Sequence, residues 1–198
     1  MKALPKILLA LTAVAALSVA YPAKANLITN GGFETGDFTG WTLINGNIGG
    51  NCNVVGTLGG NSPHSGNFQA VFVPGHEPGN NFVGISQTLT TTPSTIYTVD
   101  FWANATASGS LSVSWGGSTV FSHLFPGATG GYSEFTFNVT ASSASTDLSF
   151  VVSDSSGLFL DDISVNPAGV GVPDSGSTVS LLACALLGLA GLRRKLGC

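Results

Sequence analysis

Hydrophobic and polar residues alternate with a period of two along much of the chain. Between positions 97 and 103, Tyr97, Val99, Phe101 and Ala103 fall on one face of an extended segment. Alternation of this kind is typical of half-buried antiparallel strands. The same pattern recurs in three further segments, at Leu111, Val113 and Trp115, at Phe135, Phe137 and Val139, and at Leu148, Phe150 and Val152.

Glycine, asparagine and serine separate these short hydrophobic runs. Gly116-Gly117 lies between a run that ends at Trp115 and another that contains Val120 and Phe121, which predicts a hairpin turn. No segment between residues 26 and 167 has a convincing helical period. Many short strands at intervals of roughly ten residues predict an all-β fold, an antiparallel β-sandwich or jelly roll.

Both ends of the chain are hydrophobic and differ from the middle. Lys2 and Lys6 precede an apolar stretch that ends with Ala23-Lys24-Ala25, the pattern of a signal peptide cleaved after Ala25. The alternative is an uncleaved N-terminal anchor. The second run, 178–192, is shorter than the roughly 20 residues of a stable membrane span. We therefore expect a signal helix in 1–25, a β-sandwich domain in 26–167, a linker in 168–177, a hydrophobic membrane helix in 178–192 and a basic cytoplasmic tail in 193–198.

Positive charge is confined to these ends. All six lysines and arginines lie outside residues 26–171, whereas nine of the ten acidic residues lie inside. A domain without a cation cannot neutralise phosphates, which excludes nucleic-acid binding. Carboxylates without cationic partners are either solvated or bind a metal, and calcium is the hard cation available outside the cell.

The central domain contains few residues suited to catalysis. No catalytic motif is present, and His64, His76 and His123 are expected to be solvated or hydrogen-bonded. Glu77 and Glu134 could supply the two carboxylates of a glycoside hydrolase, but nothing in the sequence places them together. We predict that the protein is not an enzyme, with a polysaccharide-acting hydrolase as the alternative.

The three tryptophans are expected to differ in their positions. Trp41 follows a turn-like segment and Trp115 shares the face of its hydrophobic neighbours, so both are predicted to be buried. Trp102 is out of phase with the buried face and shares its own face with Asp100 and Asn104. An aromatic ring beside polar groups suits a sugar; the alternative is a tryptophan that only lies on the sheet surface or beneath a loop.

Short motifs across residues 27–167 together resemble a known family. In order, they are Asn30-Gly31-Gly32-Phe33-Glu34, Phe38-Thr39-Gly40-Trp41, His64-Ser65-Gly66, Gln87-Thr88-Leu89, Tyr97 to Phe101 and Leu160-Asp161-Asp162-Ile163. Their order and spacing are similar to those of galactose-binding-like jelly rolls of the carbohydrate-binding-module type.

The resemblance implies a structural calcium ion where the opening and closing strands meet. Glu34, Asp161 and Asp162 would be its carboxylate ligands, and backbone carbonyls near Asn67 and Asn30 would complete the shell. The alternative is that Glu34 faces solvent and that Asp161-Asp162 only ends a strand. The ion would have a structural role, because calcium binds six to eight hard oxygen ligands without redox chemistry.

The end of the chain combines three elements in a fixed order. They are Val172-Pro173-Asp174-Ser175-Gly176, the hydrophobic run and Arg193-Arg194-Lys195. Together they resemble the VPDSG variant of PEP-CTERM sorting sequences. That resemblance implies processing by an exosortase and an association with exopolysaccharide or biofilm, and the basic cluster is expected to stay cytoplasmic. The alternative is a permanent tail anchor.

These observations lead to one functional prediction. We expect an exported protein at the cell surface or in the extracellular matrix, held transiently in the membrane by its C-terminal segment. There it would bind extracellular polysaccharide or mediate adhesion. The alternative among non-enzymes is a structural matrix protein without sugar specificity.

Overall fold

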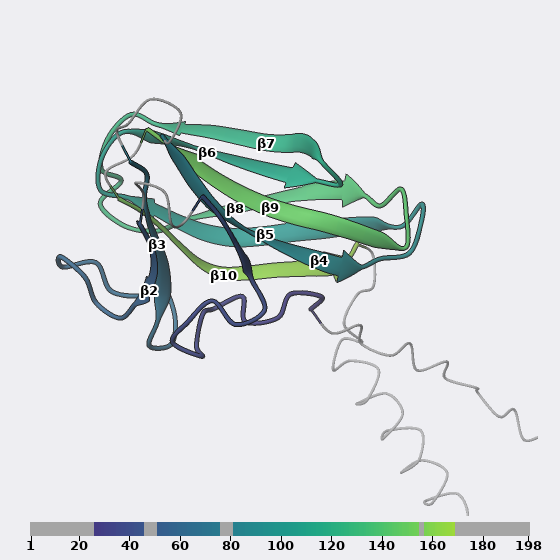
Figure 1. Ribbon diagram of the computed structural model, residues 1–198, viewed down its shortest axis with the longest axis horizontal. Coiled ribbons are helices and arrows are strands. Elements are labelled where there is room, and N and C mark those ends of the chain that lie inside the picture. The colour runs from purple at the N-terminus through teal and green to yellow at the C-terminus, as the bar shows by residue number, and fades with distance from the viewer. Residues whose placement is uncertain (1–25, 46–50, 76–80, 155–156, 169–198) are drawn as a thin grey trace, which may run out of the picture.

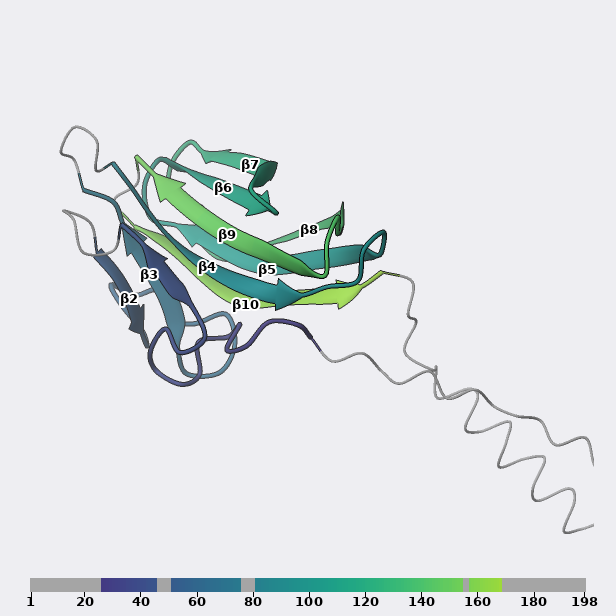
Figure 2. The same ribbon diagram turned by 45° about the vertical axis from the view of Figure 1, so that its right-hand side comes forward.

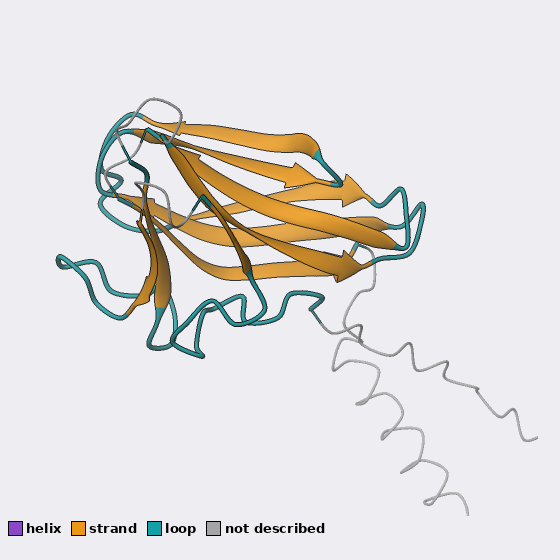
Figure 3. Cartoon of the chain, in the orientation of Figure 1, coloured by secondary structure: helices purple, strands orange, loops and turns teal. Residues whose placement is uncertain are grey.

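The computed structural model describes residues 26–45, 51–75, 81–154 and 157–168, which contain ten β-strands and no helix (Figure 3). The predicted signal helix, sorting motif, hydrophobic helix and basic tail lie outside these residues. Within the described ranges, no helix has the length and apolar character to cross a membrane.

The strands form two five-stranded antiparallel sheets, which confirms the predicted β-sandwich. Sheet A has the order β1-β4-β9-β6-β7, with bounds Thr42–Ile44, Phe82–Thr90, Ser145–Ser153, Gly109–Trp115 and Ser118–Phe125. Sheet B has the order β2-β3-β10-β5-β8, with bounds Asn51–Val55, Gln69–Val73, Leu158–Pro167, Ile96–Ala105 and Ser133–Thr140. The two sheets lie face to face. The short strands β2 and β3 lie at a large angle to the long strands (Figures 1 and 2).

The predicted hairpin connects β6 to β7. Trp115 pairs with Ser118, and the two residues between them, Gly116 and Gly117, have φ values of 58° and 82°. A two-residue turn with positive φ at both positions matches the right-handed twist of the strands, and glycine adopts it without a Cβ penalty.

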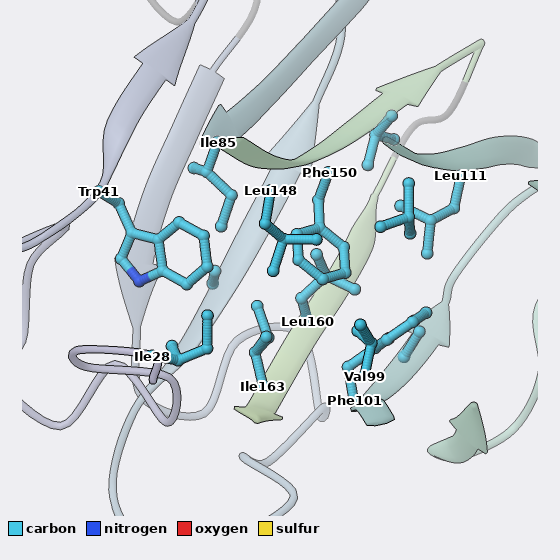
Figure 4. Packing of buried hydrophobic residues seen from close by; sticks show 14 of the residues in the cluster. Ile28, Trp41, Ile85, Val99, Phe101, Leu111, Leu148, Phe150, Leu160 and Ile163 are labelled. Carbon is cyan, nitrogen blue, oxygen red and sulfur yellow. The ribbon is translucent and has the colours of Figure 1, made fainter. Parts of the chain in front are cut away.

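The hydrophobic core lies between the two inner faces. Phe101 from sheet B and Phe150 from sheet A are both fully buried, with their ring centroids 5.1 Å apart. Figure 4 shows side chains of the two sheets pointing toward one another. Trp41 and Trp115 are buried as predicted, and each indole N–H donates to a backbone carbonyl, those of Asn30 and Thr140. The period-two pattern therefore identified the core face correctly.

The segment before β1 contains turns where the resemblance led us to expect an opening strand. Asn30 and Phe33 have positive φ values of 56° and 57°, which interrupts an extended conformation. The segment is nevertheless tied to β10, because Leu27 N–H donates to the Val165 carbonyl and Ile163 N–H donates to the Gly31 carbonyl. In the part of the chain that the structure describes, residues 26–168 supply every strand of both sheets and the hydrophobic core between them. A segment with its own core is what an independently folding domain needs, and we call it the 26–168 unit.

Candidate functional site

Three acidic side chains from opposite ends of the domain meet beside Gly32. A Cβ atom added at Gly32 would lie 3.3 Å from Asp162 Oδ1, 3.8 Å from Asp161 Oδ1 and 3.8 Å from Glu34 Cγ. We refer to Glu34, Asp161 and Asp162 as the carboxylate cluster. A shift in the register of β10 against β5 between Asp161 and Ser164, with a φ of 49° at Asp162, turns both aspartates toward this point.

Asp161 is fully buried and is bound by backbone donors. Its Oδ2 accepts hydrogen bonds from the N–H groups of His64 and Ser65 at 2.8 and 3.2 Å, and its Oδ1 accepts one from Asp162 N–H at 2.8 Å. Burial raises the pKa of Asp161 to about 6, although these N–H groups act in the opposite direction. The carboxylate thus anchors the segment at His64 to β10.

Glu34 and Asp162 bind the same segment through further hydrogen bonds. Glu34 Oε1 accepts from the N–H groups of Asn67 and Phe68, which lowers the pKa of Glu34. Asp162 lies 2.7 Å from His64 Nδ1 and accepts a hydrogen bond from Ser65 Oγ, also at 2.7 Å. The three carboxylates of the cluster therefore fix the loop at residues 64–68 to β10 and to the segment before β1.

The donor chemistry of the cluster suits calcium, and its carboxylates also bind donors of the protein itself. Each carboxylate already accepts protein hydrogen bonds, and the Asn67 side chain contributes an N–H donor to Glu34 rather than an oxygen. Across the ranges that the structure describes, no three His, Cys, Asp or Glu side chains are placed to hold a metal ion. Calcium stays a prediction, and no further step depends on it.

Chelation tests this prediction directly. If calcium binds the folded state, excess EDTA should lower the melting temperature, because a ligand present at 100 times its Kd stabilises by about 2.7 kcal/mol. Each kcal/mol corresponds to roughly 2–4 °C in a domain of this size. CaCl2 added back, but not MgCl2, should restore the midpoint. An unchanged midpoint in EDTA would mean that hydrogen bonds alone close the cluster.

Trp102 lies on the outer face of sheet B, as its phase in the sequence predicted. Its indole stacks on the His64 ring, with centroids 3.8 Å apart and an interplanar angle of 14°. Tyr132 meets the same imidazole edge-on at 5.5 Å. We call Trp102, His64 and Tyr132 the aromatic cluster. Because Asp162 holds His64, the aromatic cluster and the carboxylate cluster form one connected unit.

The two polar neighbours of Trp102 have different surroundings. Asp100 is half-buried and accepts one hydrogen bond from Thr136 at 3.2 Å. Asn104 is only 3 % exposed; its Nδ2 donates to Asn61 Oδ1, and its Oδ1 accepts from Thr129 Oγ1 at 2.7 Å. The loop that contains Asn61 covers Asn104, so this side chain positions the loop and its amide is not free for a ligand.

A pocket of about 300 Å³ lies on the same outer face. Val71 of β3 pairs with Phe159 of β10, and both side chains line it with Leu58 and Val73. We did not predict this pocket. The sequence contained an indication of it, because residues 70–73 and 158–160 are apolar on both faces, as in strands covered on both sides.

The remaining candidate residues do not form a catalytic group in the described part of the chain. Glu134 lies in β8 opposite Trp102, whereas Glu77 and His76 are outside the described residues. His123 packs against Phe125 and Phe135. Burial raises the pKa of the Cys52 thiol to about 11, so this cysteine is protonated at neutral pH.

Comparison with known proteins first confirms the sorting signal. The VPDSG-CTERM motif matches residues 171–196, a stretch that includes all three elements described above. No curated protein matches the chain by sequence. The C-terminal motif supports export and association with the cell surface or membrane.

The β-sandwich is similar in fold to solved structures that include carbohydrate-binding modules. Similar solved structures include TmCBM61 in complex with β-1,4-galactotriose, at 20 % identity, a TM-score of 0.54 and coverage of 72 % of this chain and 99 % of that chain. The CBM22-1 xylan-binding domain of Paenibacillus barcinonensis Xyn10C is similar at 17 % identity and a TM-score of 0.53, over 75 % and 97 % of the two chains.

Proteins with other activities share this fold. A Stig cyclase from Fischerella sp. TAU matches at 17 % identity and a TM-score of 0.55, over 72 % of this chain and 98 % of that one. The enzymatically active domain of tailspike protein 4 from bacteriophage CBA120 matches at 16 % identity and a TM-score of 0.53, over 72 % of this chain, which spans 21 % of the tailspike chain. The fold therefore serves both binding and catalysis, and the residues of the site determine which of the two a given protein performs.

Proposed function

We propose that this is a non-catalytic, exported protein that binds neutral polysaccharide through the outer face of sheet B. The observation that carries the proposal is the aromatic cluster, in which Trp102, His64 and Tyr132 gather on the face of a domain without lysine or arginine. Aromatic rings offer an apolar surface to the C–H faces of sugars, while neighbouring polar groups bind hydroxyls.

The charge of the domain favours a neutral glycan over an acidic one. Uronates and sulfates would approach nine acidic side chains with no cation to pair with them. Asp100, two residues before Trp102 on β5, and Glu134, opposite Trp102 on β8, can accept hydrogen bonds from sugar hydroxyls. These carboxylates would in contrast repel an anionic chain.

The sorting motif supports a location for this binding. In this proposal an exosortase-type enzyme processes the C-terminal segment after export, and the domain remains in the exopolysaccharide layer, where polysaccharide binding produces adhesion. Hydrolysis is a weaker proposal, because it needs two carboxylates free to act across the substrate. Near Trp102, both Asp161 and Asp162 are held by internal donors.

Replacing Trp102 with alanine should weaken binding to neutral polysaccharide about tenfold. An aromatic stacking contact is worth roughly 0.5–1.5 kcal/mol beyond its buried area, and each 1.4 kcal/mol is a tenfold change in Kd. Affinity electrophoresis or a glycan array with the 26–168 unit measures the effect. Leu124→Ala is the matched control, since Leu124 is 70 % exposed on β7 of the other sheet.

Two results would replace this proposal with an alternative. Failure of the wild-type protein to bind any neutral glycan would favour a structural matrix protein. Release of soluble sugars from a polysaccharide, abolished by Glu134→Gln, would instead identify a hydrolase.

A further inference from the structure

The pocket on the outer face of sheet B has an apolar floor. Val71 and Phe159, only 5 % and 3 % exposed, form the floor together with Val73, and Leu58 stands at the rim with 46 % of its surface exposed. The volume of about 300 Å³ is at the small end of the range for ligand pockets. It suits a single small group and not an extended chain.

The polar side chains around the pocket are already bound within the protein. Asn61 Oδ1 accepts from Asn104, and the Asn61 side-chain N–H lies within reach of the Leu58 carbonyl. Thr106 Oγ1 donates to the Gly157 carbonyl at 3.0 Å. A bare sugar hydroxyl placed on the apolar floor would lose its water without gaining a side-chain partner, which is unfavourable.

The pocket is also close to the aromatic cluster. Asn104 lies two residues from Trp102 on the same face of β5, roughly 7 Å along the strand. Its amide contacts Asn61 in the pocket wall. A sugar stacked at Trp102 would therefore have an adjacent residue, or a substituent of its own ring, within reach of the pocket.

We propose that this pocket receives an apolar substituent of the polysaccharide, an O-acetyl group carried by a neutral sugar. The inference rests on the proposed function and narrows its ligand to an acylated glycan. An acetyl ester has a methyl group for the floor of Val71 and Phe159, carries no charge and donates no hydrogen bond. Its methyl group therefore suits the apolar floor and it requires no hydrogen-bond acceptor, whereas an acidic substituent would face an anionic domain.

The test compares one polymer in two forms, O-acetylated xylan and the same xylan after alkaline deacetylation. Each methyl group that becomes buried should strengthen binding about fourfold. We therefore expect the 26–168 unit to bind the acetylated form at least fourfold more tightly, as measured by isothermal titration calorimetry or affinity electrophoresis.

Variants separate the pocket from the aromatic cluster. Leu58→Ser removes the apolar side chain at the rim while the floor of Val71 and Phe159 remains, so it should reduce the preference for the acetylated form and leave binding of the deacetylated form unchanged. Because Leu58 is 46 % exposed in a loop, the change should not prevent folding. Leu124→Ser, a matched change at an exposed leucine on the opposite sheet, should leave the preference intact. Trp102→Ala should weaken binding of both forms.

Three outcomes would overturn the inference. Equal binding of the two polymers by the wild-type protein would refute it while the proposed function stands. An undiminished preference in Leu58→Ser would place the acetyl group elsewhere. Binding of neither polymer, nor of any other neutral glycan, would refute the inference together with the proposed function.

Discussion

Replacing Asp161 with alanine is expected to lower the free energy of unfolding by about 3 kcal/mol or more. Three backbone N–H groups, those of His64, Ser65 and Asp162, would lose their acceptor, and a buried donor left without a partner costs about 1–3 kcal/mol. Urea denaturation followed by tryptophan fluorescence measures the change. The loss should also move His64 from Trp102 and so reduce glycan binding.

Two further variants separate this role from a general effect of charge. Asp161→Asn keeps one oxygen for the His64 and Ser65 donors but places an N–H group against Asp162 N–H, so an intermediate loss is expected. Asp147→Ala removes an exposed carboxylate that accepts a hydrogen bond from Thr88, and should cost less than about 1 kcal/mol. Equal losses for Asp161→Ala and Asp147→Ala would contradict the anchoring role of Asp161.

A methyl group at Gly31 should destabilise the domain by about 2–3 kcal/mol. A Cβ atom at this position would lie 2.0 Å from the Ile163 carbonyl oxygen, so the segment before β1 would have to move away from β10. That movement would weaken the Ile163 N–H to Gly31 carbonyl hydrogen bond. Thermal unfolding followed by circular dichroism would show the loss as a lower midpoint for Gly31→Ala.

Gly131→Ala is the matched control for this change. A Cβ atom at Gly131 has nothing within 4 Å, so the substitution should leave stability nearly unchanged. A small increase is also consistent, because alanine restricts the unfolded chain more than glycine does. A midpoint for Gly31→Ala equal to that of Gly131→Ala would show that the N-terminal segment does not pack on β10 as described.

Most of the sandwich could be predicted because its strands have a local signature. Period-two alternation identified the buried faces of β5, β6, β8 and β9, and Gly116-Gly117 identified the β6–β7 hairpin. The segment 30–34 was predicted less well. Its motif led us to expect a strand, whereas positive φ values at Asn30 and Phe33 produce turns. Backbone hydrogen bonds to β10, more than 130 residues away, hold that conformation.

The candidate site was predictable only in part, because its side chains come from distant segments. The phase of Trp102 placed it on the outer face, but nothing near it in the chain predicted that His64 would stack on its indole. Asn104 was predicted to bind a ligand for the same reason. Its neighbours in sequence do not reveal that its side-chain amide is hydrogen-bonded to Asn61 and Thr129. The pocket has the same origin, since its wall belongs to a loop and its floor to two other strands.

The linear order of residues was sufficient for the properties that depend on local pattern or on composition. These are the sorting motif at the C-terminal end, the absence of lysine and arginine between residues 26 and 171 and the alternation that defines the core face. Tertiary structure alone decided which polar groups are free and which are bound within the protein. Hydrogen-bond partners such as Asp161 and His64, 97 positions apart, become neighbours only when the two sheets close around the core.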